Sequence, residues 1–384
     1  MFYSKIQAAI ATAILLASLP FSASAQDKIV KPIEKGIDME IVFCVDTTGS
    51  MGGLIEGAKV KVWSIVNEII KQKPTPSIKI GLIAYRDQGD SYVTQVFDLS
   101  DDLDATYKNL LTFSANGGGD TPEHVNKALD DAVTQIKWSE GPDALKVIYL
   151  VGDAPPHMDY NDGFDYHKTT ENAVKKYIYI NTIRCGNDET AGAAWQEIAR
   201  LGEGKFFSID ATGGMIAITT PMDKELTELS SKLTSTLLAY GDAGEAKMKD
   251  MEKMDETMSA PASSSMVVAG AARAELMADK GFSGKDSEYD LLEAVKANSV
   301  KLEEVKPEDL PEEMRKMTLD EKKTYLTEKE KEREAVKTKI AELSKKRAEY
   351  IQDEMKKLNA NDENAFDKVV VKNLQEMIQK KQTK

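Results

Sequence analysis

The chain has 384 residues, with 64 Asp and Glu against 50 Lys and Arg, and a formal net charge of −14. This balance argues against a nucleic-acid-binding protein, because contacts to phosphates require clustered basic side chains. The length corresponds to about two domains of roughly 100 to 200 residues.

Residues 1–25 have the pattern of a secretory signal peptide. Lys5 gives a positive start, residues 6–19 are largely apolar, and Ala23-Ser24-Ala25 forms a cleavage site before Gln26. The apolar core is too short to span a membrane comfortably, and no later run has that length. We therefore expect cleavage after Ala25 and a periplasmic or secreted mature chain without a transmembrane segment.

The first strong strand signal is the apolar run 39–45, which ends at Asp46-Thr47-Thr48-Gly49-Ser50. Asp46, Thr48 and Ser50 occupy alternate positions, so the loop can direct one carboxylate and two hydroxyls to one point. Oxygen ligands of this kind suit a hard divalent cation. A simple capping turn is the structural alternative.

Strand and helix patterns then alternate along the chain. Strands are predicted at 78–85, 93–99, 144–151, 178–185 and 205–209, and helices at 57–70, 103–113, 125–138, 169–177, 195–201 and 226–238. This order predicts an α/β fold with a doubly wound, mostly parallel, six-stranded sheet. Ligands of such sheets bind where the winding reverses, beyond the strands that end at Asp46 and Asp153.

Three glycines at 117–119 precede Asp120-Thr121-Pro122-Glu123. A glycine run suits a backbone that passes close to another group. Thr121 as a helix N-cap, with Pro122 in the first helical position, is the structural alternative.

Together these motifs resemble the metal-ion-dependent adhesion site of von Willebrand factor type A domains, over residues 36–240. The resemblance implies a Mg²⁺ site, with Ca²⁺ or Mn²⁺ as alternatives, and an open position that a carboxylate of a protein partner fills. The residues implied as the metal site are Asp46, Thr48, Ser50, Thr121 and Asp153. Thr48 stands where Ser is more usual, which keeps the hydroxyl. Arg86-Asp87 and the segments 117–123 and 152–157 resemble a bacterial branch of the family.

Cys44 and Cys185 are the two cysteines. Each lies near the end of a predicted strand, and a third strand separates the two, which places them roughly 9 to 10 Å apart. A disulfide requires Cα atoms closer than about 7 Å, so both are predicted to be buried free thiols.

The histidines offer a competing interpretation of the function. His157 and His167 lie in one loop with Asp159, Asp162 and Asp165, and His124 is the third histidine. The loop could form a second metal site or supply a general base, which would make the protein a metal-dependent hydrolase. The simpler interpretation is a solvated loop at the rim of the first site.

The remaining chain is predicted to be a linker and helical segment (241–280) followed by a helical module (281–384). Met248, Met251, Met254 and Met258 share a helical face, which favours packing over Cu(I) binding. Residues 260–272 are predicted to be a linker or hinge. Thr318 and Glu321 form a capping box before a long helix. The apolar stripe is interrupted over 327–334, which favours a helical hairpin packed on itself or on the sheet domain over a long coiled coil.

The sequence thus favours a non-enzymatic, metal-dependent protein-binding module outside the cytoplasm. Two rivals remain open: a metal-dependent hydrolase using His157 and nearby aspartates, and a structural envelope protein with a vestigial metal site.

Overall fold

The structure is a computed structural model that describes residues 36–260, 264–279, 286–358 and 363–383. The predicted signal peptide lies outside the described residues. From β1 onward the described elements belong to one compact unit.

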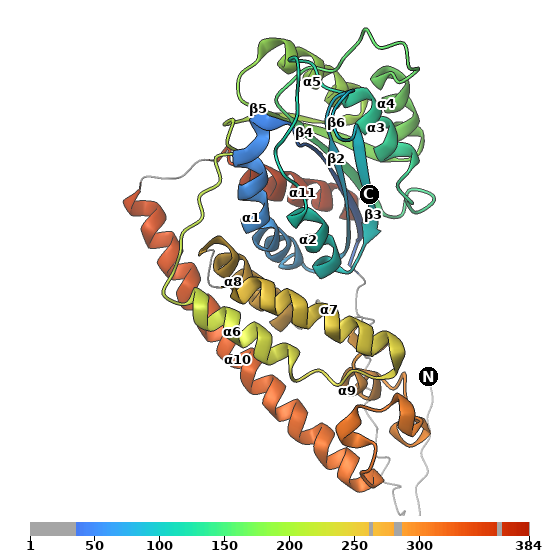
Figure 1. The fold of residues 1–384 in the computed structure, drawn as a ribbon, viewed down its shortest axis with the longest axis vertical. Coiled ribbons are helices and arrows are strands. Elements are labelled where there is room, and N and C mark those ends of the chain that lie inside the picture. The colour runs from blue at the N-terminus through green and yellow to red at the C-terminus, as the bar shows by residue number, and fades with distance from the viewer. Residues whose placement is uncertain (1–35, 261–263, 280–285, 359–362, 384) are drawn as a thin grey trace, which may run out of the picture. The chain divides into compact units, whose positions relative to one another are not determined.

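A six-stranded sheet with the order β3-β2-β1-β4-β5-β6 forms the centre of the fold (Figure 1). Its strands are β1 (Asp38–Asp46), β2 (Ser77–Tyr85), β3 (Thr94–Ser100), β4 (Leu145–Gly152), β5 (Ile178–Cys185) and β6 (Glu203–Ile209). Only β3 is antiparallel to its neighbour, β2. The predicted doubly wound, mostly parallel sheet is confirmed, and β1 and β4 lie side by side at the point where the winding reverses.

Helices cover both faces of the sheet because successive side chains of each strand point to opposite faces. Ile41 and Phe43 of β1 face one core, whereas Val42 and Cys44 face the other. The first core is covered by α1 (Gly52–Ile70), α2 (Leu103–Leu111) and α11 (Phe366–Gln382), and the second by α3 (Val125–Thr134), α4 (Tyr166–Lys175) and α5 (Glu189–Leu201).

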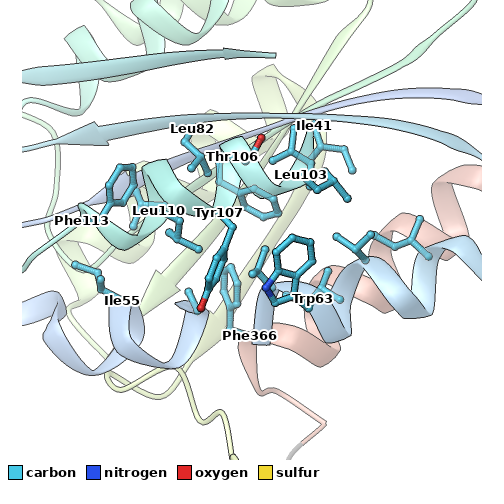
Figure 2. A pocket seen from close by; sticks show the side chains of 18 of the residues that line it. Ile41, Ile55, Trp63, Leu82, Leu103, Thr106, Tyr107, Leu110, Phe113 and Phe366 are labelled. Carbon is cyan, nitrogen blue, oxygen red and sulfur yellow. The ribbon is translucent and has the colours of Figure 1, made fainter. Parts of the chain in front are cut away.

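An apolar cavity of about 50 Å³ lies in the first core, between the sheet, α1 and α2 (Figure 2). Trp63, Tyr107 and Phe366 are among the residues that line it. Nearly all the side chains that line it are apolar, as expected for a gap within a hydrophobic core. We assign the cavity to core packing.

Several helix boundaries differ from the prediction, and two of them lie next to the candidate site. Helix α1 begins at Gly52, earlier than expected, after a short 3-10 turn at Gly49–Met51, because the early glycines weaken the helical pattern. Helix α3 begins at Val125 as predicted but ends at Thr134, earlier than expected, and its N-cap residue is His124, so Thr121 is not its N-cap. Instead, Glu123 forms a parallel bridge with Pro156, which holds this segment extended beside the loop after β4.

The remaining helices are α6 (Asp223–Thr234), α7 (Gly241–Ser259), α8 (Ser264–Ala278), α9 (Leu291–Lys296) and α10 (Leu319–Lys357). The interpretation of residues 260–272 as a linker is wrong for residues 264–272, which belong to α8. Ala269 and Ala272 are buried, and the Ala272 carbonyl accepts a hydrogen bond from Asn67 of α1 at 2.8 Å. The alanines of this segment are good helix formers and allow close packing.

The methionine stripe packs as predicted, since Met251, Met254 and Met258 of α7 are buried. The capping box of Thr318 and Glu321 at the start of α10 is also present. Helix α10 continues through the interrupted stripe, where the buried Arg333 pairs with Asp290 at 2.5 Å. Helix α11 packs on α1 and β4, so this part of the C-terminal region lies on the sheet domain.

No helix among the described residues is both long and apolar enough to cross a membrane.

Candidate metal centre

The loop after β1 brings together the first three predicted site residues. Asp46 is fully buried, and its Oδ1 accepts hydrogen bonds from the Thr48 backbone N–H at 2.8 Å and the Thr48 hydroxyl at 2.6 Å. The Thr48 Oγ1 lies 3.4 Å from Ser50 Oγ. Thr48 is buried and Ser50 is exposed, so the group runs from the protein interior to its surface.

Asp153 approaches this loop from the neighbouring strand. Val45 of β1 pairs with Val151 of β4, and both chains leave the sheet at the same edge. Burial raises the pKa of Asp46 to about 7; the hydrogen bonds from Thr48 oppose this rise, and the charge of Asp153 adds to it. Asp153 itself is half-buried.

The glycine-rich segment packs over the first loop. The Gly49 N–H donates to the Gly117 carbonyl at 3.3 Å, and the Asn116 N–H donates to the Thr47 carbonyl at 3.0 Å. Gly117 has φ +79°, and a Cβ there would overlap the Asp90 carboxylate. Only glycine combines this backbone conformation with so close an approach.

Thr121, the fourth predicted site residue, lies on the same segment but is exposed. In the described part of the chain no hydrogen bond joins its hydroxyl to the first loop. The residue that does reach the cluster is Glu123, two positions later.

Glu123 is an acidic member of this cluster that the sequence prediction missed. It is 4% exposed, and its Oε2 is buried without a hydrogen-bond partner. Burial, followed by the negative charges of Asp46, Asp87, Asp90 and Asp153, raises its pKa to about 9. Its position after Thr-Pro suggested a helix start, and the only signal for a site was its closeness to the glycine run.

The donor set fits a hard divalent cation. The Asp46 Oδ2 is buried and has no hydrogen-bond partner. Gly152 keeps the space beside it open, since a Cβ at Gly152 would lie 3.1 Å from that oxygen and overlap the Tyr85 hydroxyl. The nearby cation Arg86 donates its hydrogen bonds to the Thr47 and Ser114 carbonyls and the Ser91 hydroxyl instead. Buried carboxylates need a compensating charge, and a divalent cation bound by oxygens would supply it.

The histidines separate into distinct pairs rather than sharing one loop site. His157 Nδ1 lies 2.8 Å from Asp159, His124 Nε2 lies 2.8 Å from Asp162, and the exposed His167 pairs with Asp165 at 2.8 Å. The Nε2 of His157 instead faces Asp87 and Asp120, which come from two other loops.

Both cysteines are buried and free, as predicted. Cys44 on β1 and Cys185 on β5 are separated by β4.

Comparisons with known proteins match the region of the sheet. A family model described as von Willebrand factor A domain matches residues 40–210. The chain is 31% identical over 125 residues to an ariadne-like RING finger protein of Acanthamoeba polyphaga mimivirus, covering 33% of this chain and 12% of that protein. It is 33% identical over 114 residues to von Willebrand factor A domain-containing protein 7 of Rattus norvegicus, covering 30% of this chain and 12% of that protein. The match thus spans about an eighth of the length of each relative.

Among solved structures, the chain is similar to the VWA domain of SpRpn10, with a TM-score of 0.35 and 18% sequence identity, covering 46% of this chain and 89% of that one. The family model matches the segment from β1 to β6, which holds the whole six-stranded sheet. Residues 40–210 of this chain therefore form a von Willebrand factor A domain.

Proposed function

We propose that this chain is a divalent-cation-dependent protein-binding module that acts outside the cytoplasm and captures an acidic group of a partner. A von Willebrand factor A domain suggests a protein-interaction module. The observation that carries the metal dependence is the buried Asp46 oxygen, which has no hydrogen-bond partner and lies in a cluster of oxygen donors.

Asp46, Thr48, Ser50, Thr121 and Asp153 are the residues that we propose hold the ion, directly or through water. Mg²⁺ is our choice because it takes few protein ligands and keeps water molecules, with Ca²⁺ and Mn²⁺ as alternatives. Ser50 and Thr121 are exposed, so an ion that they hold would be accessible to a partner at the surface. A carboxylate of that partner would replace one water molecule.

Calorimetric titration with Mg²⁺ tests the site. We expect one bound ion per chain and at least tenfold weaker binding in Ser50→Ala. Ser50 is exposed, so its loss removes a hydroxyl ligand without opening the core. The matched control is Ser259→Ala, an exposed serine at the end of α7, which should bind as the wild type does. Equal affinity in all three proteins would contradict the site.

Partner capture tests the interaction. Protein immobilised with Mg²⁺ should retain an envelope protein that chelation releases and that Ser50→Ala does not bind. The partner should be recovered intact. Retention in chelator would favour the structural rival, and recovery of cleaved partner would favour the hydrolase.

The proposed location rests on residues 1–25. The intact mass of protein isolated from the envelope fraction should correspond to a chain that starts at Gln26, with two alkylatable thiols. A mass that retains residues 1–25 would contradict cleavage.

A further inference from the structure

Three side chains from three different loops lie close together beside the proposed Mg²⁺ site. Asp87 follows β2, Asp120 belongs to the glycine-rich segment, and His157 follows β4. The His157 Nε2 lies 3.5 Å from Asp87 Oδ2 and 3.7 Å from Asp120 Oδ1. One ligand atom of each residue lies within 4.8 Å of the others.

The histidine nitrogen in this group has no hydrogen bond. His157 is 6% exposed, and its Nε2 and the Asp87 Oδ1 are both buried polar atoms without a hydrogen-bond partner. The distances from Nε2 to the two carboxylates exceed the usual range of about 2.7 to 3.2 Å for an N–H···O bond. Direct hydrogen bonding therefore does not account for the arrangement.

The other ring nitrogen explains the orientation of the imidazole. His157 Nδ1 lies 2.8 Å from Asp159 Oδ1, as expected when Nδ1–H donates to that carboxylate. Nε2 then carries a lone pair directed at two carboxylates, an arrangement that is repulsive unless a cation lies between them. A carboxylate on the remote ring nitrogen is the usual support of a metal-binding histidine.

The neighbouring tyrosine also holds the group in place. The Tyr160 ring stacks on His157, with centroids 4.1 Å apart and planes 15° from parallel. Its hydroxyl donates to Asp87 Oδ2 at 2.7 Å. The positions of the imidazole and the first carboxylate are thus set by the same side chain.

The two distances from the histidine nitrogen are close to those around a small tetrahedral ion. Ligands at about 2.0 to 2.2 Å from a tetrahedral zinc ion lie roughly 3.3 to 3.6 Å from one another. The two distances from Nε2, 3.5 and 3.7 Å, are close to this range. Imidazole favours first-row transition metals over Mg²⁺ and Ca²⁺, which prefer oxygen ligands.

We propose that Asp87, Asp120 and His157 form a second cation site, which takes Zn²⁺ or a similar first-row transition metal ion. The fourth position is left to water, since Asp120 is 65% exposed. Because Asp120 directly precedes Thr121, an ion here would also fasten the glycine-rich segment to the loops after β2 and β4.

The experiment is a Zn²⁺ titration of the full chain against a chromophoric chelator, in excess Mg²⁺. We expect one tightly bound Zn²⁺ per chain and, with Co²⁺ in its place, the intense visible absorption of a tetrahedral ion. Asp120→Asn should weaken Zn²⁺ binding at least tenfold. Because the Asp120 side chain is exposed, this variant should fold as the wild type does. Asp159→Asn should weaken binding about 10- to 100-fold, the usual cost of losing the carboxylate behind a ligating histidine.

Two control variants separate this site from its surroundings. Asp162→Asn removes a carboxylate from the same loop that pairs with His124, and it should leave Zn²⁺ affinity within about twofold of the wild type. Ser50→Ala should weaken Mg²⁺ binding but leave Zn²⁺ binding unchanged. The proposal is overturned if the wild type binds no stoichiometric Zn²⁺, if Asp120→Asn binds as tightly as the wild type, or if Ser50→Ala abolishes Zn²⁺ binding.

Discussion

Burial and the proposed metal binding place opposite requirements on Asp46. Its side chain is buried at the end of a core strand, and in the proposed site it would also have to be charged to hold a cation. One of its oxygens organises the loop by accepting two hydrogen bonds from Thr48, while the other has no hydrogen-bond partner. Without a cation, burial favours the protonated carboxyl, which is why its pKa rises to about 7. The ionised Asp46 carboxylate therefore lowers the stability of the metal-free fold.

Replacement of Asp46 by Asn should distinguish the cost of the buried charge from the contribution of the carboxylate to metal binding. The amide oxygen can still accept from Thr48, and the buried charge disappears. We expect Asp46→Asn at pH 8 to unfold at a higher temperature than metal-free wild type, and a gain of about 1 kcal/mol would raise the Tm of so large a cooperative unit by roughly 1 to 2 °C. The Mg²⁺-induced increase in Tm should vanish.

Thermal melts of both proteins in chelator and in Mg²⁺ measure the two Tm values and the Mg²⁺-induced increase. If the variant melts lower than the wild type in chelator, the carboxylate is not a source of instability. If the variant keeps the full Mg²⁺-induced increase, Asp46 is not a ligand.

The stability of the metal-free protein should fall as pH rises. The folded-state pKa values of Asp46 and Glu123, about 7 and about 9, lie above their ordinary values of 3.8 and 4.5. The folded state thus retains protons that the unfolded chain has lost. The stabilisation that these bound protons give the folded state is complete below pH of about 4 and disappears by pH of about 9. Mg²⁺ competes with these protons, so its affinity should rise over the same range.

Melts in chelator at several pH values test the slope, and Glu123→Gln serves as the comparison. The variant should lose less stability between pH 7 and 9 than the wild type does. Identical pH profiles for the two proteins would show that Glu123 titrates as an ordinary surface carboxyl.

The sequence predicted the part of the site that is local in the chain. Asp46, Thr48 and Ser50 are alternate residues of one loop, so their convergence followed from spacing. Asp153 followed from the strand order. Glu123 and the partners of His157 could not be found in this way, because their contacts depend on how three separate loops pack. His157 has aspartates nearby in sequence, yet its unbonded nitrogen faces Asp87, 70 positions earlier.

At the level of elements, the six strands and the alternation of helices were predictable because each carries its own hydrophobic period. The helices after residue 240 were harder to place, since amphipathic patterns identify a buried face but not its partner. Helix α11 illustrates the difficulty. The sequence predicted helices that pack on themselves or on the sheet domain, but only the structure shows that α11 covers the sheet beside α1, with the Tyr149 hydroxyl donating to Asn373 at 2.6 Å.

Helix α11 should therefore be essential to the stability of the sheet. Leu374 is 0% exposed, and Leu374→Ala should lower the free energy of unfolding by about 2 to 5 kcal/mol, the usual cost of a cavity in a core. The matched control is Leu358→Ala at the end of α10, where the leucine is 60% exposed and its loss should cost less than about 0.5 kcal/mol. Urea unfolding measures both, and equal effects would contradict the packing of α11 on the sheet.

Across the whole molecule, buried arginines connect the helices to the sheet domain. Arg273 of α8 is 1% exposed and pairs with Asp104 of α2 and Asp255 of α7, each at 2.7 Å. Arg347 of α10 pairs with the buried Asp223 of α6 at 2.6 Å. Loss of one partner from such a buried pair usually costs several kcal/mol, so these contacts oppose separation of the parts.

The described residues should consequently unfold as one cooperative unit. All three tryptophans, Trp63, Trp138 and Trp195, lie within the von Willebrand factor A domain, so fluorescence reports on that domain. Circular dichroism at 222 nm reports on helices throughout the chain. The two signals should give the same midpoint in urea. Separate midpoints would show that the helices after residue 240 fold as an independent module.

The position of α11 also has a consequence for the order of synthesis. Tyr149 and Asn373, which hydrogen-bond in the core, are 224 residues apart in sequence. A ribosome has therefore translated every strand of the sheet well before it reaches the helix that covers one of its faces. The apolar surface awaiting α11 stays uncovered during that interval, which exposes the nascent chain to aggregation. A chaperone that shields this surface until α11 is available would have to release it before the sheet domain is complete.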